Sequence, residues 1–273
     1  MGLIEVMMEA VMVDVGLSDE QLERYRRHIL LPNVGVKGQK TILASKILII
    51  GTGGLGSPIA MYLAAAGVGT LGIVDGDVVD CSNLHRQIIH STTDIGRSKV
   101  DSAEETIKAI NPDVKVIKYN TRVTSSNIID VINEYDFIID GTDNFPSKFL
   151  INDACVLAGK PYSHGGILQF QGQTMTVLPG ETTCYRCVFL HPPLPDAVLN
   201  CRESGVLGPI AGMLGTIQAT EALKYVLGVG KLLTNTLMTF DALDMRFRSA
   251  SVPRNRNCPI CSKHPTITTL IDY

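Results

Sequence analysis

Residues 46–56 read Lys-Ile-Leu-Ile-Ile-Gly-Thr-Gly-Gly-Leu-Gly, an apolar run that ends abruptly in glycines. The aliphatic side chains at residues 47–50 are typical of a buried parallel strand that is covered by helices on both faces. Three glycines then fit the G-x-G-x-x-G pattern: Gly51, Gly53 and Gly56. In proteins with this pattern a phosphate binds at the start of the following helix, which we expect here near Gly54. Glycine-rich turns are common, so a plain strand-to-helix turn without a ligand is the alternative.

A second apolar run and the loop after it predict further parts of a nucleotide site. Residues 70–75 form the next expected strand and end in Asp75, where a ribose-binding carboxylate is expected. The chain then carries Asp77 and a polar loop, residues 80–87. Ligands of open α/β sheets bind at the carboxyl ends of the strands, so we expect polar side chains of this loop beside the glycine turn: Ser82, Asn83 and Arg86.

Two later segments add a cation and several acids at the same edge of the sheet. Lys99 stands near the start of a helix expected over residues 96–110, which the following Asn-Pro pair ends. The expected buried strand at 136–140 is followed by Gly-Thr-Asp-Asn, which places oxygen ligands at its carboxyl end: Asp140, Asp143 and Asn144. Two or three such oxygens favour a magnesium ion. A turn rich in Asp and Asn is the alternative.

The alternation of strands and helices predicts an α/β fold, with a Rossmann-like, doubly wound and mostly parallel sheet in the N-terminal half. The C-terminal half is expected to continue into a mixed or antiparallel sheet, after a long crossover loop at residues 179–208. The expected strands cover residues 46–50, 70–75, 114–118, 136–140, 161–163, 173–178, 237–241 and 245–248. The expected helices cover residues 18–31, 54–66, 96–110, 125–133, 146–157 and 209–227. Residues 18–273 then form one domain, and residues 1–17 are an N-terminal extension.

The first expected helix, residues 18–31, is strongly basic. Ser18 and Gln21 form an S-x-x-Q capping box at its start, and Pro32 follows its end. Four cationic side chains crowd its middle: Arg24, Arg26, Arg27 and His28. A solvated helix face is the ordinary explanation, but cations this close repel one another unless an anion or an acidic surface faces some of them.

Seven cysteines without a secretory signal indicate a reducing, cytoplasmic environment. Four of them form two C-x-x-C pairs and predict a zinc site: Cys184, Cys187, Cys258 and Cys261. Four thiolates leave no open coordination position, so the metal would be structural and would clip the crossover loop to the C-terminal tail. Redox-active thiols or a disulfide are the alternatives. Cys201 lies beside Arg202, whose charge favours a thiolate, and is a candidate nucleophile.

Composition argues against two classes of partner. The formal net charge of −3 and the charged fraction of 19% give no basic footprint for nucleic acid. No apolar run approaches the roughly 20 residues that a membrane helix needs. We therefore expect a soluble, cytoplasmic protein that binds neither nucleic acid nor a membrane.

The predicted ligands favour ATP with Mg²⁺ over a nicotinamide cofactor. A dehydrogenase binds one diphosphate and has no use for a metal-binding acid together with several cations directed at phosphates. Positioned cations and a metal ion are what phosphoryl chemistry on ATP requires. Arg86, Lys99 and Asp143 are the expected contacts of the triphosphate and its ion.

An ordered set of motifs resembles the MoeB/ThiF/HesA family of adenylyltransferases, which are related to the ubiquitin-activating enzymes. The resemblance runs from about Ser18 to Cys261 and is specific as a set, although no single motif is. The set comprises Arg24-Tyr-Arg-Arg27, Gly51-Thr-Gly-Gly-Leu-Gly56, Asp75, Ser82-Asn-Leu-His-Arg-Gln87, Lys99, Thr142-Asp-Asn144, both cysteine pairs and Asn200-Cys-Arg202. His85 stands where many members have Gln.

The resemblance implies that ATP activates the C-terminal glycine carboxylate of a ubiquitin-like sulfur carrier, of the ThiS or MoaD type, as an acyl-adenylate. Pyrophosphate is released, and the carrier serves thiamine or molybdopterin biosynthesis. The resemblance assigns the ribose to Asp75, the phosphates to Asn83, Arg86 and Lys99, and the magnesium ion to Asp143; the other residues expected around the nucleotide are Gly51, Gly53, Gly54, Gly56, Asp77, Ser82 and Asn144. Arg27 would reach the neighbouring subunit's site, which implies a homodimer. Cys201 matches the position where some members bind the carrier covalently.

Three alternatives stay open at this point. The first is an ATP-dependent tRNA threonylcarbamoyladenosine dehydratase of the same superfamily, which the near-neutral charge disfavours. The second is a dehydrogenase, and the third is a docking module that binds the nucleotide without turnover. A sulfurtransferase or a cysteine desulfurase is a further expected partner, while the sequence does not identify the carrier, its pathway or a role for residues 1–17.

Overall fold

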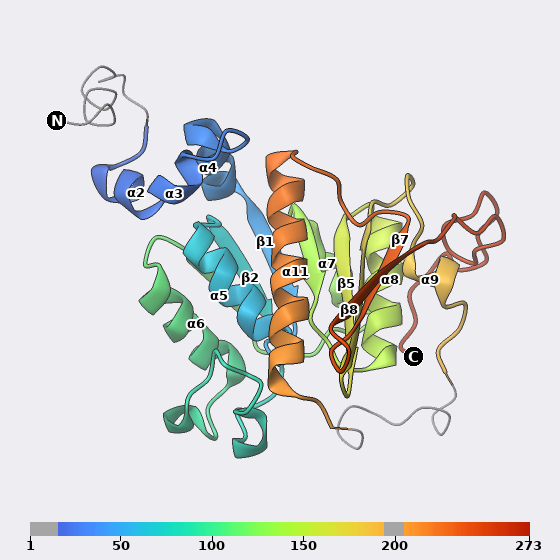
Figure 1. Ribbon diagram of the computed structural model, residues 1–273. Helices are drawn as coiled ribbons and strands as arrows, with labels where there is room; N and C mark the ends of the chain where they lie inside the picture. The colour runs from blue at the N-terminus through green and yellow to red at the C-terminus, as the bar shows by residue number, and fades with distance from the viewer. Residues whose placement is uncertain (1–15, 194–204) are drawn as a thin grey trace.

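The computed structural model describes residues 16–193 and 205–273 and contains one eight-stranded sheet (Figure 1). Five strands run parallel, in the spatial order β3 (Lys115–Tyr119), β2 (Thr70–Val74), β1 (Lys46–Ile50), β4 (Phe137–Asp140) and β5 (Tyr162–Leu168). The sheet continues antiparallel through β6 (Gln171–Val177), β7 (Thr236–Asp241) and β8 (Arg246–Ser251). The predicted fold class, parallel in the first half and antiparallel in the second, is therefore confirmed.

Helices cover both faces of the sheet, as the apolar run of β1 predicts. Ile47 and Ile49 pack in one core with helices α4 (Gly35–Ala44), α5 (Gly56–Ala66), α6 (Lys99–Ile110) and α11 (Gly208–Leu227). Leu48 and Ile50 point the other way, into a core with α7 (Ile128–Asn133) and α8 (Phe145–Ala158). Successive strand residues face opposite sides of a sheet, so a strand buried on both faces must be apolar throughout.

The N-terminal segment differs from the single helix predicted over residues 18–31. It forms two short helices, α2 (Asp19–Arg24) and α3 (Arg26–Ile29), separated at Tyr25, although the predicted capping box of Ser18 and Gln21 is present. Tyr25 is buried, and its hydroxyl accepts a hydrogen bond from Asn111 at 2.8 Å. This tertiary contact turns the chain toward the core at the break between the helices. The following helix α4 was not predicted.

The remaining elements lie close to their predicted positions, with β5 extended by five residues beyond the expected strand at 161–163. The predicted crossover loop contains α9 (Tyr185–Val188), and its middle, residues 194–204, lies outside the described part of the chain. The predicted extension, residues 1–17, also falls almost entirely outside it. Among the described helices, none combines the length and the apolar character that crossing a membrane demands.

Candidate nucleotide site and cysteine cluster

The glycine turn joins β1 to α5 at the carboxyl edge of the parallel sheet. Gly51 has a φ of +95°, a left-handed conformation that side chains other than glycine adopt rarely. A Cβ at Gly56 would lie 1.9 Å from the carbonyl oxygen of Gly51, so only glycine lets α5 begin this close to the turn. A Cβ at Gly53 would meet no described atom nearer than the side-chain amide of Gln87, at 3.5 Å. The peptide at Gly53 is therefore open to a ligand.

Asp75 connects the end of β2 to this turn. Its Oδ2 atom accepts hydrogen bonds from the amide of Thr52 at 2.9 Å and from the Thr52 hydroxyl at 3.0 Å. Its Oδ1 atom accepts a third from the amide of Asp77 at 3.0 Å. The predicted ribose-binding acid thus lies directly beside the glycine turn, in an orientation fixed by neighbouring backbone.

The polar loop after β2 also packs against the glycine turn. The stem of Arg86 lies over Gly54, since a Cβ on that glycine would be 3.5 Å from Cγ of the arginine. Its guanidinium donates to the carbonyl of Ser82 at 3.0 Å, and no acid among the described residues pairs with it. Asn83 donates only weakly, to the Ser82 hydroxyl at 3.3 Å. The structure therefore brings an uncompensated cation to the turn, as predicted for this loop.

Lys99 opens α6, and its side chain is 7% exposed. Its ammonium lies 3.3 Å from one oxygen of Asp77, while Arg122 donates to the other oxygen at 2.9 Å. Burial raises the pKa of Asp77, but the hydrogen bond from Arg122 and the charge of Lys99 outweigh it, so the net pKa is lowered. Asp77 thus holds Lys99 at this edge. No motif predicted Arg122 at this edge, because the residue follows β3 rather than β2.

The loop after β4 places Asp143 and Asn144 at the surface. The side-chain oxygen of Asn144 accepts from the amide of Ser147 at 2.9 Å and caps helix α8, which provides a structural explanation for this residue. Asp140, which we expected to join them as a metal ligand, is buried instead. That expectation is wrong, because its carboxylate is already saturated by protein donors.

Asp140 belongs to a buried polar cluster that the sequence did not reveal. Its Oδ2 atom lies 3.0 Å from both Lys148 Nζ and His164 Nδ1. Burial alone would raise the pKa of Asp140, but the charge of Lys148 and the hydrogen bond with His164 lower it to about 2. Burial also lowers the pKa of His164, which keeps its ring neutral. Gln218 reaches the same strand end from α11 and donates to the carbonyl of Asp140 at 2.9 Å.

The four paired cysteines converge on one point, as predicted. Their sulfur atoms all lie within 4.8 Å of one another, with Cys184 between 3.5 and 3.8 Å from each of the other three. Metal–sulfur bonds of about 2.3 Å in a tetrahedron require sulfurs about 3.8 Å apart, so the geometry fits a four-thiolate metal site. Among the described residues, this is the only group of three or more metal-binding side chains.

Side chains around the cysteine cluster anchor it to helix α8. Arg186, between two of the cysteines, is buried and donates to both oxygens of Asp153 at 2.7 and 2.9 Å. The hydroxyl of Tyr273 donates to the same carboxylate at 2.5 Å, and the ring of Tyr273 lies 5.0 Å from the guanidinium. Figure 1 shows α9 and the C-terminal segment side by side. The crossover loop and the tail are thus both anchored on Asp153 of α8, in addition to the contacts between their thiols.

The remaining residues of interest are Arg27 and the three cysteines outside the cluster. Arg27 is exposed, and no described residue pairs with it. Cys155 is buried in α8, and Cys81 is exposed in the loop after β2. Cys201 lies outside the described residues.

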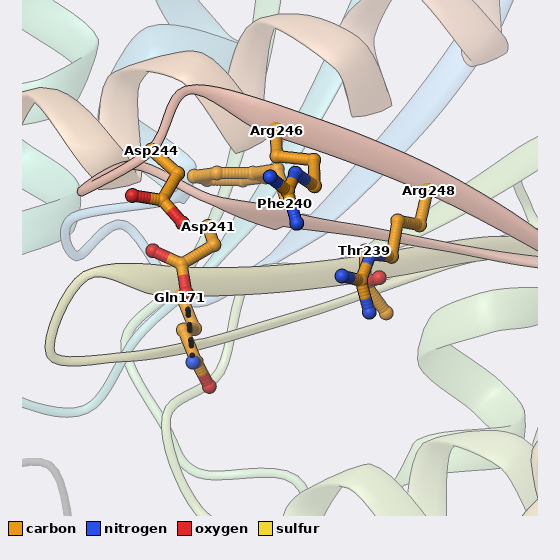
Figure 2. Close-up of a pocket in the computed structure, with 7 residues that line it drawn as sticks. All are labelled: Gln171, Thr239, Phe240, Asp241, Asp244, Arg246 and Arg248. Carbon is orange, nitrogen blue, oxygen red and sulfur yellow. Dashed lines mark hydrogen bonds between the residues drawn. The ribbon is translucent and has the colours of Figure 1, made fainter.

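A shallow pocket of about 200 Å³ lies elsewhere, on the antiparallel part of the sheet (Figure 2). It is lined by Gln171, Thr239, Phe240, Asp241, Asp244, Arg246 and Arg248. None of the residues predicted to bind the nucleotide lines it. The predicted site is instead an open edge of the sheet, formed by the glycine turn and the loops after β2 and β4.

Several known proteins are similar to this chain over most of its length. A sulfur carrier protein adenylyltransferase of Thermus thermophilus is 45% identical over 261 residues, which cover 94% of this chain and 96% of that protein. A SAMP-activating enzyme E1 of Haloferax volcanii is 44% identical over 91% of this chain and 92% of its own length. MoeZ of Mycobacterium tuberculosis is 46% identical, but the chain spans only 65% of that protein.

Solved structures show the same fold at lower identity. The crystal structure of E. coli MccB with ATP has a TM-score of 0.77 and 21% identity, over 87% of this chain and 74% of that one. The family model described as the ThiF family matches residues 25–260, a range that includes the glycine turn and three of the four clustered cysteines. By this match and by the 45% identity to a relative of nearly equal length, the chain belongs to the ThiF family.

Proposed function

We propose that the chain is an ATP-dependent adenylyltransferase, which activates the C-terminal glycine carboxylate of a ubiquitin-like sulfur carrier of the ThiS or MoaD type. The carboxylate attacks the α-phosphorus of ATP, forms a carrier acyl-adenylate and releases pyrophosphate. The observation that carries this proposal is the convergence at one sheet edge of an open glycine turn, the unpaired Arg86 and the buried Lys99. The names of the Thermus and Haloferax relatives support the same reaction.

In the proposed reaction, the cationic and the acidic residues of the site have different roles. Attack by one anion on another requires that the negative charge be neutralised and the reacting groups held in line. The amides of the glycine turn and the cations of Arg86 and Lys99 would hold the phosphates, with Asn83 beside them, and Asp75 would accept the ribose hydroxyls. Asp143 is exposed and no described residue pairs with it, so its carboxylate is available to the Mg²⁺ of the nucleotide. The ion would neutralise phosphate charge when bound.

Further parts of the proposal concern the metal cluster and the assembly. The four thiolates would hold a structural Zn²⁺, since they leave no position open for a substrate. The chain would act as a homodimer in which Arg27 completes the neighbouring subunit's site. Its exposed position fits a role across an interface. The carrier would receive its sulfur from a sulfurtransferase or a cysteine desulfurase, and we place the reaction in the cytoplasm.

The test is incubation with ATP, Mg²⁺ and each candidate carrier, followed by mass spectrometry of the carrier. We expect one carrier to gain the mass of AMP, and carrier-dependent exchange of labelled pyrophosphate into ATP. Removal of one transition-state donor typically costs 100-fold or more in rate, so Arg86→Ala, Lys99→Ala and Asp143→Ala should each lose the exchange. Lys118→Ala, which removes a partly exposed cation that pairs with acids of α6 rather than with Asp77, is the matched control and should keep most of it. No adduct on any carrier of the same cell would contradict the proposal.

A further inference from the structure

We infer that Lys148 is a positioning residue, which fixes the loop that carries Asp143 and so determines where the metal of the nucleotide binds. The inference rests on the proposed function, because it concerns the proposed metal ligand. Asp143 is exposed and forms no hydrogen bond or ion pair with another described residue. The backbone of residues 141–144 must therefore set its position, since its own carboxylate has no protein contact to do so.

Lys148 binds this loop from the first turn of α8. Its ammonium donates to Asp140 Oδ2 at 3.0 Å, to the carbonyl of Thr142 at 2.8 Å and to the carbonyl of Gly165. An ammonium has three N–H donors, so these acceptors use all of them. Because the side chain is only 7% exposed, the contacts form in a site with little water and are correspondingly strong. One side chain thus joins the end of β4, the loop and β5.

Asp140 holds the same loop residue from the opposite side. Its Oδ1 atom accepts from the amide of Thr142 at 3.0 Å and from the Thr142 hydroxyl at 2.6 Å. The amide and the carbonyl of Thr142 are therefore both bound, one by Asp140 and one by Lys148. Asp143 is the next residue, so its Cα position follows from these bonds.

The loop is also in direct backbone contact with the glycine turn. The amide of Gly141 donates to the carbonyl of Ile50 at 2.9 Å, and a Cβ at Gly141 would lie 2.9 Å from the carbonyl oxygen of Gly51. Any movement of the loop changes the distance between Asp143 and the turn. A metal ion held by Asp143 would be placed correctly for the phosphates only if that distance is maintained.

The test is the substitution Lys148→Met, which removes the ammonium and keeps the apolar stem. Loss of a residue that orients a metal ligand typically costs 10- to 100-fold in metal affinity, so we expect Mn²⁺ to bind that much more weakly. Binding is measured by electron paramagnetic resonance of Mn²⁺ with a non-hydrolysable ATP analogue, in the absence of any carrier. The maximal exchange rate at saturating Mg²⁺ should fall less than the metal affinity does.

Two variants separate positioning from stability. Lys148→Met leaves Asp140 buried without its cation, which destabilises the fold, so Lys148→Met with Asp140→Asn removes the uncompensated charge. We expect the double variant to regain thermal stability and to keep the weak Mn²⁺ binding, because Thr142 still lacks its donor. Lys160→Met is the matched control: Lys160 donates to the carbonyls of Asn133 and Tyr135 at 2.7 and 3.0 Å, before β4 begins. It should bind Mn²⁺ normally.

The possible results distinguish a failure of the inference about Lys148 from a failure of the proposed function. Normal Mn²⁺ binding by folded Lys148→Met overturns the inference and leaves the proposed function intact. Recovery of Mn²⁺ affinity together with stability in the double variant overturns it as well, because the lysine would then act on stability alone. Wild-type protein that binds no Mn²⁺ with the ATP analogue overturns the proposed function itself.

Discussion

The glycines of the turn after β1 have separable roles, although the sequence pattern treats them alike. Gly56 permits close packing of backbone on backbone, while a Cβ at Gly53 would make only an ordinary contact with Gln87. The structure therefore distinguishes a glycine that the fold requires from one that only the proposed phosphate would require. This distinction leads to a prediction at the scale of single residues.

Gly56→Ala should destabilise the protein, and Gly53→Ala should weaken nucleotide binding without doing so. The added methyl at residue 56 would lie 1.9 Å from the Gly51 carbonyl, and overpacking of this kind typically costs about 1–3 kcal/mol. The methyl at residue 53 makes only ordinary contacts but occupies the space of a phosphate, so the Kd for ATP should rise at least about tenfold. Urea unfolding and calorimetric titration with ATP measure the two effects. Equal stability losses in both variants would contradict the assignment.

The buried cluster shows where residue-level prediction fails. Asp140 follows an apolar strand at an edge where acids bind metals, so the sequence favoured a ligand. Its actual partners, Lys148 and His164, come from the next helix and the next strand, and the register of Ile139 with Ser163 brings that histidine alongside. A lysine in a helix is usually solvated, and no local pattern indicates that this one is buried.

At the scale of elements, most strands and helices were predictable from the sequence, whereas helix α4 and the break at Tyr25 were not. The central strands and the helices α5, α6, α8 and α11 form because their sequences are apolar in the right period or bounded by glycine and proline. The break at Tyr25 depends instead on Asn111, 86 residues away, and α4 on the core it covers. Contacts this distant leave no trace in a local window.

If the cysteine cluster holds the proposed zinc, the crossover segment and the C-terminal tail depend on it for stability, which gives the second prediction. Chelation of zinc or Cys258→Ser should lower the midpoint of thermal unfolding by roughly 10 °C or more, because a chain of this size shifts about 2–4 °C per kcal/mol. Cys155→Ser, at a buried thiol outside the cluster, is the control for substitution of a cysteine as such. Zinc content is measured by atomic absorption alongside calorimetry. A fully metal-free protein with an unchanged midpoint would show that the thiols do not bind a structural ion.

The whole molecule follows the doubly wound plan that its first glycine turn predicts. The N-terminal half could be predicted because each strand and helix carries its own pattern. The order of the C-terminal strands could not be predicted in the same way. β7 follows β6 only after a long connection that contains α11, and β8 then pairs with β7 as a hairpin. In the candidate site, the sequence indicated the residues that stand in motifs, such as Arg86 and Asp75, but not Arg122, which reaches Asp77 from a different strand.

The proposed dimer makes a quantitative prediction for the assembled molecule. If Arg27 serves the neighbouring subunit's site, Arg27→Ala and Asp143→Ala subunits complement one another when mixed. Half of the dimers in an equal, fully exchanged mixture are mixed, and each has one intact site, so about one quarter of wild-type exchange activity should return. Analytical ultracentrifugation of each variant confirms its association state. If the mixture stays as inactive as its components, Arg27 does not act across the interface.

The cysteine cluster also bears on the order in which the chain is made and folded. Its first two thiols emerge from the ribosome before α11 and the last two strands, whereas Cys258 and Cys261 follow every strand of the sheet. During synthesis from the N-terminus, two of the four thiols are therefore present well before the other two. A metal bound by all four thiols would therefore close the fold only after every strand of the sheet has been made, so its binding would mark the completion of the nascent protein rather than its nucleation.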